Sequence, residues 1–284
     1  MRALPALLIS TLALTGCDYV DNPGAPSGDG GGNNGGTLKR RALLEEYTGH
    51  RCTTCPAAHV VAAGLANAYG DQMILVGMHV TETFAAPLDP PAADGRYSTD
   101  FRTAAGNEYV ETFAPSAIPN GLVNRTRFNS SITLSKDAWS SAIAAIVAQD
   151  AAMDVWVDTI EHDATNNTVS AVVKVAVLQP LTGEHNVVAY LTEDHIIDWQ
   201  SNALVSPSDV PDYDHRHVLR RTLGPVWGDI IIPSSAAVGD TLTMTYTDIA
   251  MDPAWVAANC EVVAYVYNTA TDEVLQANKR ELEP

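Results

Sequence analysis

The chain has 284 residues, a formal net charge of −18 and an apolar share of 46%. Nucleic-acid-binding proteins normally present a basic face, so this charge excludes nucleic acid as the expected partner. It also excludes binding of the folded body to anionic lipid headgroups.

Residues 1–17 have the pattern of a lipoprotein export signal. Arg2 precedes an apolar run from Ala3 to Leu14, which has the length of a signal-peptide core and is too short to cross a bilayer. The run leads to Leu14-Thr15-Gly16-Cys17, which resembles a bacterial lipobox. We therefore predict that Cys17 is lipidated and that this lipid holds the protein on a membrane. The alternative is an ordinary export signal that happens to contain a cysteine.

Residues 18–37 are rich in Gly, Asn and Pro and show no apolar period. Such a segment buries too little surface to offset chain entropy, so we expect a flexible tether. Export places the folded body in an oxidising compartment, where disulfides persist. With Cys17 assigned to lipid, Cys52, Cys55 and Cys260 remain. Their odd number predicts one free thiol.

Residues 38–150 alternate strand-like and helix-like patterns. Gly70 follows an Ala-rich amphipathic stretch and predicts its end, and Ser135 predicts the start of another helix as its N-cap. This order indicates an α/β domain. The expected elements are a strand at 40–49, a helix at 55–70, a strand at 72–80, a helix within 98–113, a short strand within 118–125 and a helix at 135–150.

Residues 151–284 read as one strand after another, with apolar and polar residues alternating at period two. Turn signals such as "DATNN", "PLTGE" and "VGD" separate the strands. The pattern predicts a second, all-β domain of antiparallel sandwich type. The expected strands lie at 152–163, 168–179, 185–194, 240–249 and 260–283.

Cys52-Thr53-Thr54-Cys55 lies between the first predicted strand and the first predicted helix. A cysteine at a helix N-terminus is stabilised as a thiolate by the free backbone N–H groups and the helix dipole. We therefore predict Cys52 as the attacking thiol, with His50 and Arg51 as cationic neighbours, and Cys55, one turn inside the helix, as the resolving thiol.

Two other roles compete for this cysteine pair. A zinc site needs four ligands, and beyond the pair only His59 stands at a suitable spacing. The chain has no second CxxC, so we predict no metal ion and no other cofactor. The stronger rival is a static disulfide between Cys52 and Cys55 that closes a turn and never exchanges.

Ile118-Pro119 stands before the last predicted strand of the α/β domain. Thioredoxin-like domains resemble this arrangement, because a cis-proline loop there faces the cysteine pair and presents backbone groups to the substrate chain. The resemblance implies that Ile118–Pro119 is cis and that Pro119 belongs to the catalytic site with Cys52 and Cys55. The alternative is an ordinary trans proline in a turn.

His215, His217 and Cys260 are further candidate functional residues. On one strand, His215 and His217 would share a face and offer two imidazoles to a metal, although no third ligand can be named. More often such histidines bond to neighbouring loops. Cys260 opens an apolar strand and is expected to be a buried, unreactive thiol.

The chain resembles the twenty-eight-kilodalton outer-membrane protein family, a group of exported bacterial lipoproteins. The matching segments are Glu46-Tyr47-Thr48-Gly49 before Cys52-x-x-Cys55-Pro56, then Asp100-Phe101-Arg102, the stretch Pro119-Asn120-Gly121-Leu122-Val123-Asn124-Arg125, and "YLTEDHI" and "YDHRHVLR". The resemblance implies a thioredoxin-like domain followed by a β-rich domain, lipid-anchored at the outer membrane. It brings no established reaction, and Arg51, Thr53 and Thr54 differ from the residues that surround the cysteines of thioredoxin itself.

Two functions follow from these patterns. The first is thiol–disulfide exchange on extracytoplasmic proteins by Cys52 and Cys55, beside Pro119. The second is a non-catalytic surface-binding or adhesion lipoprotein, with a structural Cys52–Cys55 disulfide and a β-domain that holds the ligand. The large β-rich half favours the second function, because thiol exchange alone would not need it.

Overall fold

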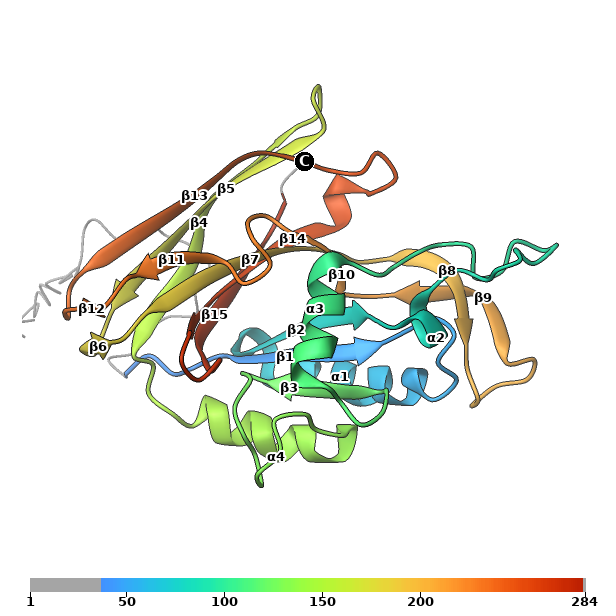
Figure 1. The fold of residues 1–284 in the computed structure, drawn as a ribbon, viewed down its shortest axis with the longest axis horizontal. Helices are drawn as coiled ribbons and strands as arrows, with labels where there is room; N and C mark the ends of the chain where they lie inside the picture. Colours follow the sequence, from blue (N-terminus) through green and yellow to red (C-terminus); the bar gives the residue numbers. More distant parts are fainter. Residues whose placement is uncertain (1–36, 283–284) are drawn as a thin grey trace, which may run out of the picture. The chain divides into compact units, whose positions relative to one another are not determined.

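The computed structural model describes residues 37–282. The predicted signal segment, with Cys17, and all but the last residue of the predicted tether lie outside the described residues. The described chain is a mixed α/β protein dominated by β-strands (Figure 1). The first half contains β1 (Ala42–Thr48), α1 (Cys55–Tyr69), β2 (Met73–His79), α2 (Glu82–Ala85), α3 (Ala104–Phe113), β3 (Asn120–Val123) and α4 (Lys136–Val147).

The elements predicted for this half are present in the expected order. Gly70 ends α1 with a positive φ of 52°, a conformation that favours glycine. Ser135 is the N-cap of α4 as predicted, although its side chain makes no capping hydrogen bond.

The second half is almost entirely β-structure. The predicted strands correspond to β4, β5, β7 and β13, and the last predicted segment is two strands, β14 and β15. The pattern missed β6 and the shorter strands between Ile196 and Ala236. The strands are β4 (Met153–Asp163), β5 (Thr168–Val177), β6 (Leu181–Thr182), β7 (His185–Glu193), β8 (Ile196–Ser201), β9 (Asp209–His215), β10 (Val218–Thr222), β11 (Asp229–Ile232), β12 (Ser235–Ala236), β13 (Thr241–Ala250), β14 (Cys260–Asn268) and β15 (Val274–Glu281).

The larger sheet has the strand order β15-β14-β7-β10-β2-β1-β3, with β11 also paired to β7. β1 and β2 are parallel, which a crossover through α1 allows, and β3 is antiparallel to β1. Val218 of β10 pairs with Gly77 of β2, so strands from both halves of the chain share one sheet. The change of sequence pattern near residue 150 therefore separates two parts of the chain that contribute strands to the same sheet. A domain boundary at this position stays a prediction.

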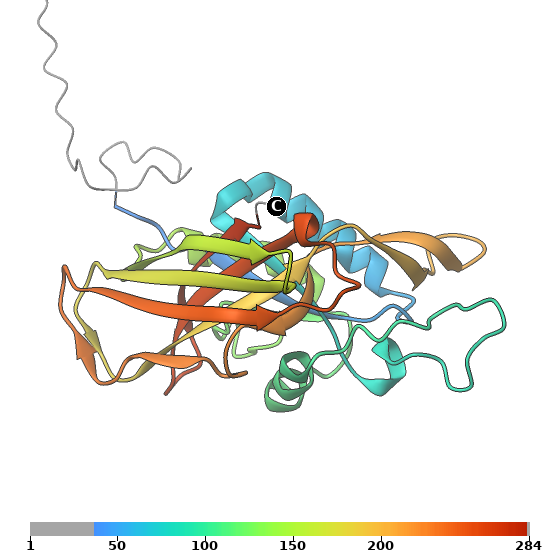
Figure 2. The same ribbon diagram turned by 90° about the horizontal axis from the view of Figure 1, so that it is seen from above.

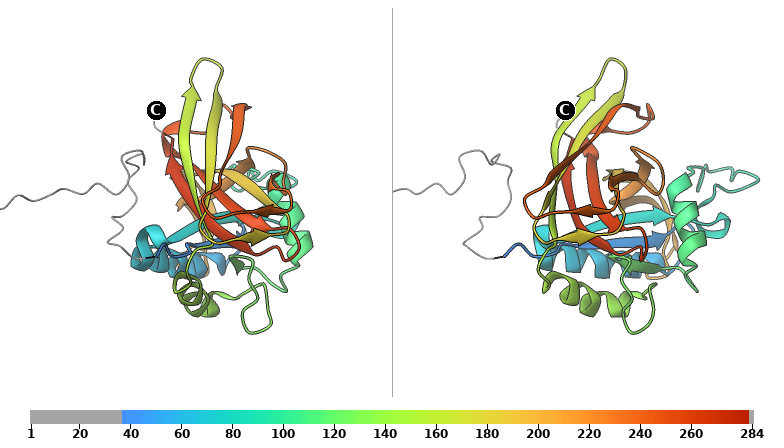
Figure 3. Two further views of the ribbon diagram at one scale, coloured as in Figure 1. Left: turned by 90° about the vertical axis from the view of Figure 1, so that its left-hand side faces the viewer. Right: turned by 60° about the vertical axis from the view of Figure 1, so that its left-hand side comes forward.

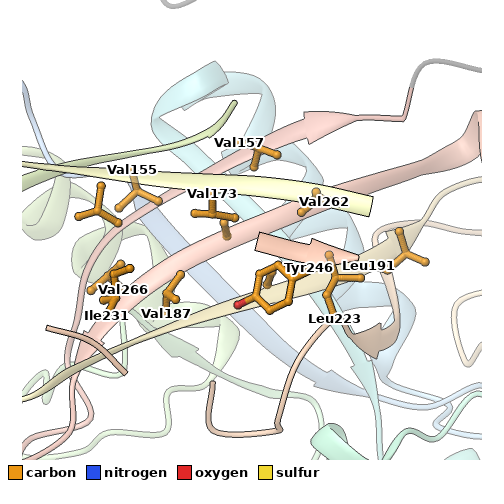
Figure 4. Close-up of a cluster of buried hydrophobic side chains, with 14 of the residues drawn as sticks. Val155, Val157, Val173, Val187, Leu191, Leu223, Ile231, Tyr246, Val262 and Val266 are labelled. Carbon is orange, nitrogen blue, oxygen red and sulfur yellow. The ribbon is translucent and has the colours of Figure 1, made fainter. Parts of the chain in front are cut away.

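A smaller sheet of order β13-β5-β4 packs on the β-rich part of the larger one. Burial alternates residue by residue along β5, as a strand with one covered face requires. Val173 of β5 and Val262 of β14 lie in the core between the two sheets, among the side chains drawn in Figure 4. Figure 3 shows the smaller sheet as a separate layer beside β14 and β15.

Helices cover both faces of the β1–β3 part of the larger sheet. α1 and α4 lie on one face, where Leu44, Ala62 and Trp139 belong to one apolar cluster. α3 covers the opposite face with Tyr109, which packs in a second cluster with Leu43. Residues that alternate along β1 therefore point to different helices. This alternation separates the side chains of Glu45 and Glu46, which point to opposite faces.

Glu45 pairs with Arg125 inside the molecule. Two nitrogens of the Arg125 guanidinium donate to the Glu45 carboxylate at 2.8 Å each, and the same guanidinium donates to the Tyr190 and Tyr265 hydroxyls. Both charged side chains are fully buried. The cluster connects β1 and the segment after β3 with β7 and β14, so it joins the two halves of the chain.

Candidate functional site

The cysteine pair lies at the start of α1, where the sequence predicts it. Cys52 and Cys55 form a disulfide, with their Cα atoms 5.4 Å apart. Thr54 is the N-cap and Cys55 is the first helical residue, so the prediction that Cys55 lies one turn inside the helix is wrong. Pro56 occupies the first turn, where its missing N–H costs no helical hydrogen bond.

A close-packed turn leads from β1 to the cysteines. A Cβ atom on Gly49 would meet the Phe84 carbonyl oxygen at 2.3 Å, so only glycine fits there. The next residue, His50, is buried, and desolvation lowers its pKa. Arg51 donates to the carbonyl oxygens of Glu82 and Thr83. His50 is therefore a neutral imidazole, and the prediction that it is a cationic neighbour of Cys52 is wrong.

Pro119 stands at the same end of β1 as the cysteine pair. Asn120 pairs with Tyr47 near the end of β1, so Pro119, the residue before Asn120, lies at this end of the pairing. The Ile118–Pro119 peptide bond is cis, as the sequence resemblance implies. The β1–β3 pairing thus brings the proline loop and the start of α1 to one edge of the sheet.

Both cysteines are buried, because a segment from the second half of the chain covers them. Cys52 is 2% exposed and Cys55 is 0% exposed. The Ser201 amide donates to the His50 carbonyl at 2.7 Å, and the Ala203 amide donates to the Thr53 carbonyl at 2.8 Å. We call residues 200–205, at the end of β8 and in the following turn, the covering segment.

One buried side chain holds the covering segment in place. The Gln200 amide nitrogen donates to the carbonyl oxygens of Cys52, at 3.0 Å, and of Gly49, at 3.3 Å. Gln200 itself is 0% exposed. The β8–β9 hairpin that carries it lies near the N-terminal end of α1 (Figure 2). Neither strand of this hairpin was predicted from sequence, because its alternation is irregular and its burial comes from α1 and the cysteine turn.

A cavity of about 400 Å³ lies on the α1 side of the same sheet edge. Glu46 and Thr48 of β1 face it, together with His79 at the end of β2, because all three point to the α1 face of their strands. His59 on α1 hydrogen-bonds to the Thr48 hydroxyl at 2.8 Å and to the Tyr213 hydroxyl at 2.7 Å.

The titrating groups of this cavity are perturbed mainly by burial. Desolvation raises the pKa of Glu46 to about 8. Desolvation, with the nearby His215 as a lesser cause, lowers the pKa of His59 to about 3 and takes that of His79 well below its usual value. Burial lowers the pKa of His215 to about 4. At neutral pH Glu46 is therefore protonated, and His59, His79 and His215 are neutral imidazoles.

His215 and His217 both line this cavity, although they do not share a strand face as predicted. β9 ends at His215, His217 has a positive φ of 54°, and β10 begins at Val218. Within residues 37–282, no group of three or more His, Cys, Asp and Glu side chains is arranged to hold a metal ion. The cysteines, joined in a disulfide, offer no thiolate to the zinc site considered with His59.

Cys260 is the free cysteine of the described residues, as the odd count predicts. It is the first residue of β14 and is 2% exposed. Desolvation, with nearby Glu193 as a lesser cause, raises the pKa of its thiol to about 12. At neutral pH the thiol is protonated and shielded, which makes it unreactive.

A protein-family model described as outer membrane protein Omp28 matches residues 106–284 of this chain. The chain belongs to the Omp28 family. The match includes Pro119 and the covering segment, whereas Cys52 and Cys55 precede it. As a member of the family, the protein is an outer membrane protein. Among residues 37–282 there is no helix long and apolar enough to cross a membrane.

Two solved structures resemble this chain in fold. HBP35 of Porphyromonas gingivalis has a TM-score of 0.64 and 14% identity, over 87% of this chain and 76% of that one. A protein of Agrobacterium tumefaciens has a TM-score of 0.50 and 11% identity, over 87% of this chain and 97% of that one. Such low identity shows a shared fold and nothing more. A search of curated protein sequences finds no match.

The sequence places Glu46 in a family motif but gives it no role. No sequence pattern identified His79 or Gln200 as residues of the site. A charged residue inside an apolar strand is the one signal that pointed to Glu46. His79 ends an apolar run and looks like a strand terminus. Gln200 lies about 150 residues from the cysteines it covers, and no local pattern links such distant segments.

Proposed function

We propose that this outer membrane lipoprotein exchanges disulfides with extracytoplasmic proteins through Cys52 and Cys55. The proposed framework is a thioredoxin-like part, over 38–150, in which α1 connects parallel strands and the cis Pro119 precedes β3. A β-rich, sandwich-like part over 151–284 follows it. The observation that carries the proposal is a disulfide at the N-terminus of α1, on the same sheet edge as Pro119.

The small size of the loop closed by the Cys52–Cys55 disulfide favours a role in exchange over a purely structural role. A Cys-x-x-Cys bridge encloses two residues, and loop entropy gives such a bridge only about 2 kcal/mol of stabilisation. Both cysteines already sit in a turn fixed by backbone hydrogen bonds from Cys52 to Gly49 and from Arg51 to Phe84. A structural role would therefore add little to this turn.

The exchange balances without a cofactor. A substrate thiolate attacks the Cys52 sulfur, the Cys52–Cys55 bond breaks, and Cys55 leaves as a thiolate. A second substrate thiolate then attacks the mixed disulfide and releases Cys52. The substrate leaves as a disulfide, two electrons stay on the protein, and the two protons of the substrate thiols protonate Cys52 and Cys55. The reverse sequence reduces a substrate disulfide.

Access to the sulfurs requires movement of the covering segment. Ser201 and Ala203 donate backbone hydrogen bonds to the cysteine turn, and Gln200 adds a side-chain bond. Each of these bonds exists only while the segment is closed. The exchange we propose is therefore gated, and a substrate reaches Cys52 after the segment opens.

The reduction potential of the full-length protein in detergent tests the proposal. Equilibration with glutathione buffers should give a potential above about −300 mV, the range of exchange proteins. The Cys260→Ser variant is the control and should give the same value, since its thiol is buried outside the pair. A potential below about −300 mV would make the disulfide structural and reject exchange.

One observation favours a second candidate, a surface-binding or adhesion lipoprotein with a static Cys52–Cys55 disulfide. The two cysteines are 2% and 0% exposed beneath the covering segment. A bridge closed in this way is protected from thiols in solution. If the double variant Cys52→Ser, Cys55→Ser kept all surface-binding activity of cells that carry the protein, this candidate would replace exchange.

The anchor is part of the same proposal. The lipobox at Leu14-Thr15-Gly16-Cys17 and the family membership together support lipidation of Cys17. The lipid would be the link to the outer membrane, and the folded body would reach its partners through the tether.

A further inference from the structure

The cavity beside α1 has the features of a ligand site that is separate from the cysteines. It lies above the carboxyl ends of the parallel strands β1 and β2, where Glu46 is opposite Gly77 and Thr48 is opposite His79. In open α/β sheets, ligands bind at this edge. A volume of about 400 Å³ suits a small organic molecule.

Buried polar atoms without partners line this cavity. Glu46 is 2% exposed and His79 is 3% exposed. Among the described residues, Glu46 Oε1 and both ring nitrogens of His79 have no hydrogen-bond partner. A buried polar atom without a hydrogen-bond partner destabilises the folded protein by about 1–3 kcal/mol. Several such atoms in one cavity therefore indicate a ligand group that forms hydrogen bonds with them.

The charge of the ligand group that this cavity would bind follows from the residues around Glu46. Glu46 has one basic neighbour in the cavity wall, His59, whose Nε2 is 3.7 Å from Glu46 Oε1. That imidazole already bonds Thr48 and Tyr213 and is neutral because it is buried. Glu46 thus lacks a counter-ion among the described residues, and a cation would supply one.

Part of the cavity lining is apolar. Val60 and Ala63 of α1 and Leu75 of β2 form this part. Val60 is 70% exposed, which is high for a valine in a helix. A ligand that matches both the polar and the apolar lining carries a positive charge at one end and a short hydrocarbon chain at the other.

We propose that this cavity binds a small organic ammonium ion, with its N–H groups on Glu46 and His79 and its hydrocarbon chain along α1. A bare metal ion fits less well, because no three ligating side chains among the described residues are suitably arranged. The overall charge of −18 also attracts cations to the protein.

Binding of the cation is coupled to a proton. Burial raises the pKa of Glu46 to about 8, so the carboxyl is protonated in the empty cavity at neutral pH. The ammonium ion stabilises the carboxylate, and Glu46 releases its proton to the solvent. The other titratable or charged groups facing the cavity are His59, His79, Tyr213, Asp214, His215, Arg216 and His217. Arg216 is paired with Asp194 and Asp214, so its charge is compensated.

Calorimetry with n-butylammonium as the probe tests this proposal on the full-length protein in detergent. Titrations near neutral pH in two amine-free buffers of different ionisation enthalpy should show saturable binding and the release of up to about one proton per site. Butyrate and 1-butanol should bind at least about tenfold more weakly. Equal binding of either analogue, or no saturable binding of the ammonium ion, would overturn the proposal.

Two pairs of variants locate the site. Ala63→Phe fills the cavity from the exposed side of α1 and should weaken binding at least about tenfold, whereas Ala68→Phe, on the same helix outside the cavity, should not. Glu46→Gln should abolish proton release, whereas the exposed Glu161→Gln should not. Binding unaffected by Ala63→Phe would place the ligand elsewhere and reject the proposal.

A peptide with one lysine distinguishes the two sources of such a cation. Tighter binding of this peptide than of n-butylammonium would support the site with a protein side chain as the ligand. Tighter binding of n-butylammonium would support it with a free amine as the ligand.

Discussion

At the scale of single residues, exposure and helix position make Cys52 and Cys55 different. After mild reduction, Cys52 should be alkylated faster than Cys55, because it precedes the helix and is 2% rather than 0% exposed. Cys260 should remain unlabelled, since burial raises the pKa of its thiol to about 12. Labelling at about pH 6 followed by peptide mapping measures all three. Faster labelling of Cys55 would reverse the roles of attacking and resolving thiol.

The buried titrating groups predict how stability depends on pH. Burial lowers the pKa of His59 from 6.5 to about 3 and that of His215 from 6.5 to about 4. Below pH 6.5 the unfolded chain binds protons at these residues that the folded protein does not bind. Stability therefore falls as the pH drops through this range.

Glu46 has the opposite effect on the pH dependence of stability. Burial raises its pKa from 4.5 to about 8, so between these values the folded protein holds a proton that the unfolded chain has lost. The stability that Glu46 contributes therefore falls as the pH rises between these two pKa values. Below about neutral pH the buried histidines, His50 and His79 included, outweigh this one carboxyl, and at higher pH Glu46 dominates.

The free energy of unfolding should therefore be largest near neutral pH and fall by less than about 1 kcal/mol per pH unit towards pH 8. Urea unfolding in amine-free buffers measures this. Glu46→Gln should remove the fall on the alkaline side, and the exposed Glu161→Gln should leave it unchanged. An alkaline slope that persists in Glu46→Gln would contradict the assignment to this residue.

At the scale of elements, the β8–β9 hairpin controls access to the disulfide. Gln200→Ala removes the side-chain hydrogen bonds to the carbonyls of Cys52 and Gly49, so the covering segment should open more often. Loss of hydrogen bonds worth about 1–2 kcal/mol predicts a rise of about five- to thirtyfold in the rate of reduction by a small thiol. Stopped-flow reduction of the full-length protein measures this rate.

Gln179→Ala is the matched control for Gln200→Ala, because Gln179 is an exposed amide after β5, outside the contacts of the cysteine turn. Its reduction rate should equal that of the wild type. Equal rates for Gln200→Ala and the wild type would show that the covering segment does not limit access.

At the scale of the whole molecule, the Glu45–Arg125 pair joins the two halves of the chain. Arg125→Met leaves the Glu45 carboxylate buried without its counter-ion, which should cost about 3–5 kcal/mol of unfolding free energy. The double variant Glu45→Gln, Arg125→Met should lose less than Arg125→Met alone, because no charge is then left unpaired. Denaturant unfolding of the four proteins measures the coupling, and additive losses would contradict it.

Anchoring also concerns the whole molecule. Cys17→Ser should release the exported protein from the membrane fraction, because the body has a net negative charge and its predicted attachment is the lipid. Fractionation of cells measures this, with Cys260→Ser as the control that should stay membrane-bound. Unchanged membrane association of Cys17→Ser would reject the lipid anchor.

Several features of this protein follow from its sequence alone. The strands and helices of the first half, the long strands of the second and the position of the cysteine pair at a helix start are local patterns of apolar spacing, caps and turns. The free Cys260 was also predicted from the cysteine count, whereas the cis peptide bond at Ile118–Pro119 was implied by the resemblance to thioredoxin-like domains. Such features depend on neighbours along the chain, which is why pattern reasoning reaches them.

Other features were decided only by the tertiary structure. The pairing of β10 with β2, the covering segment over Cys52 and the cavity around Glu46 each join residues far apart in the chain. Burial turned His50 from an expected cation into a neutral imidazole and gave Glu46 its raised pKa. Desolvation depends on what packs around a group from every side, and no spacing rule along the sequence contains that information.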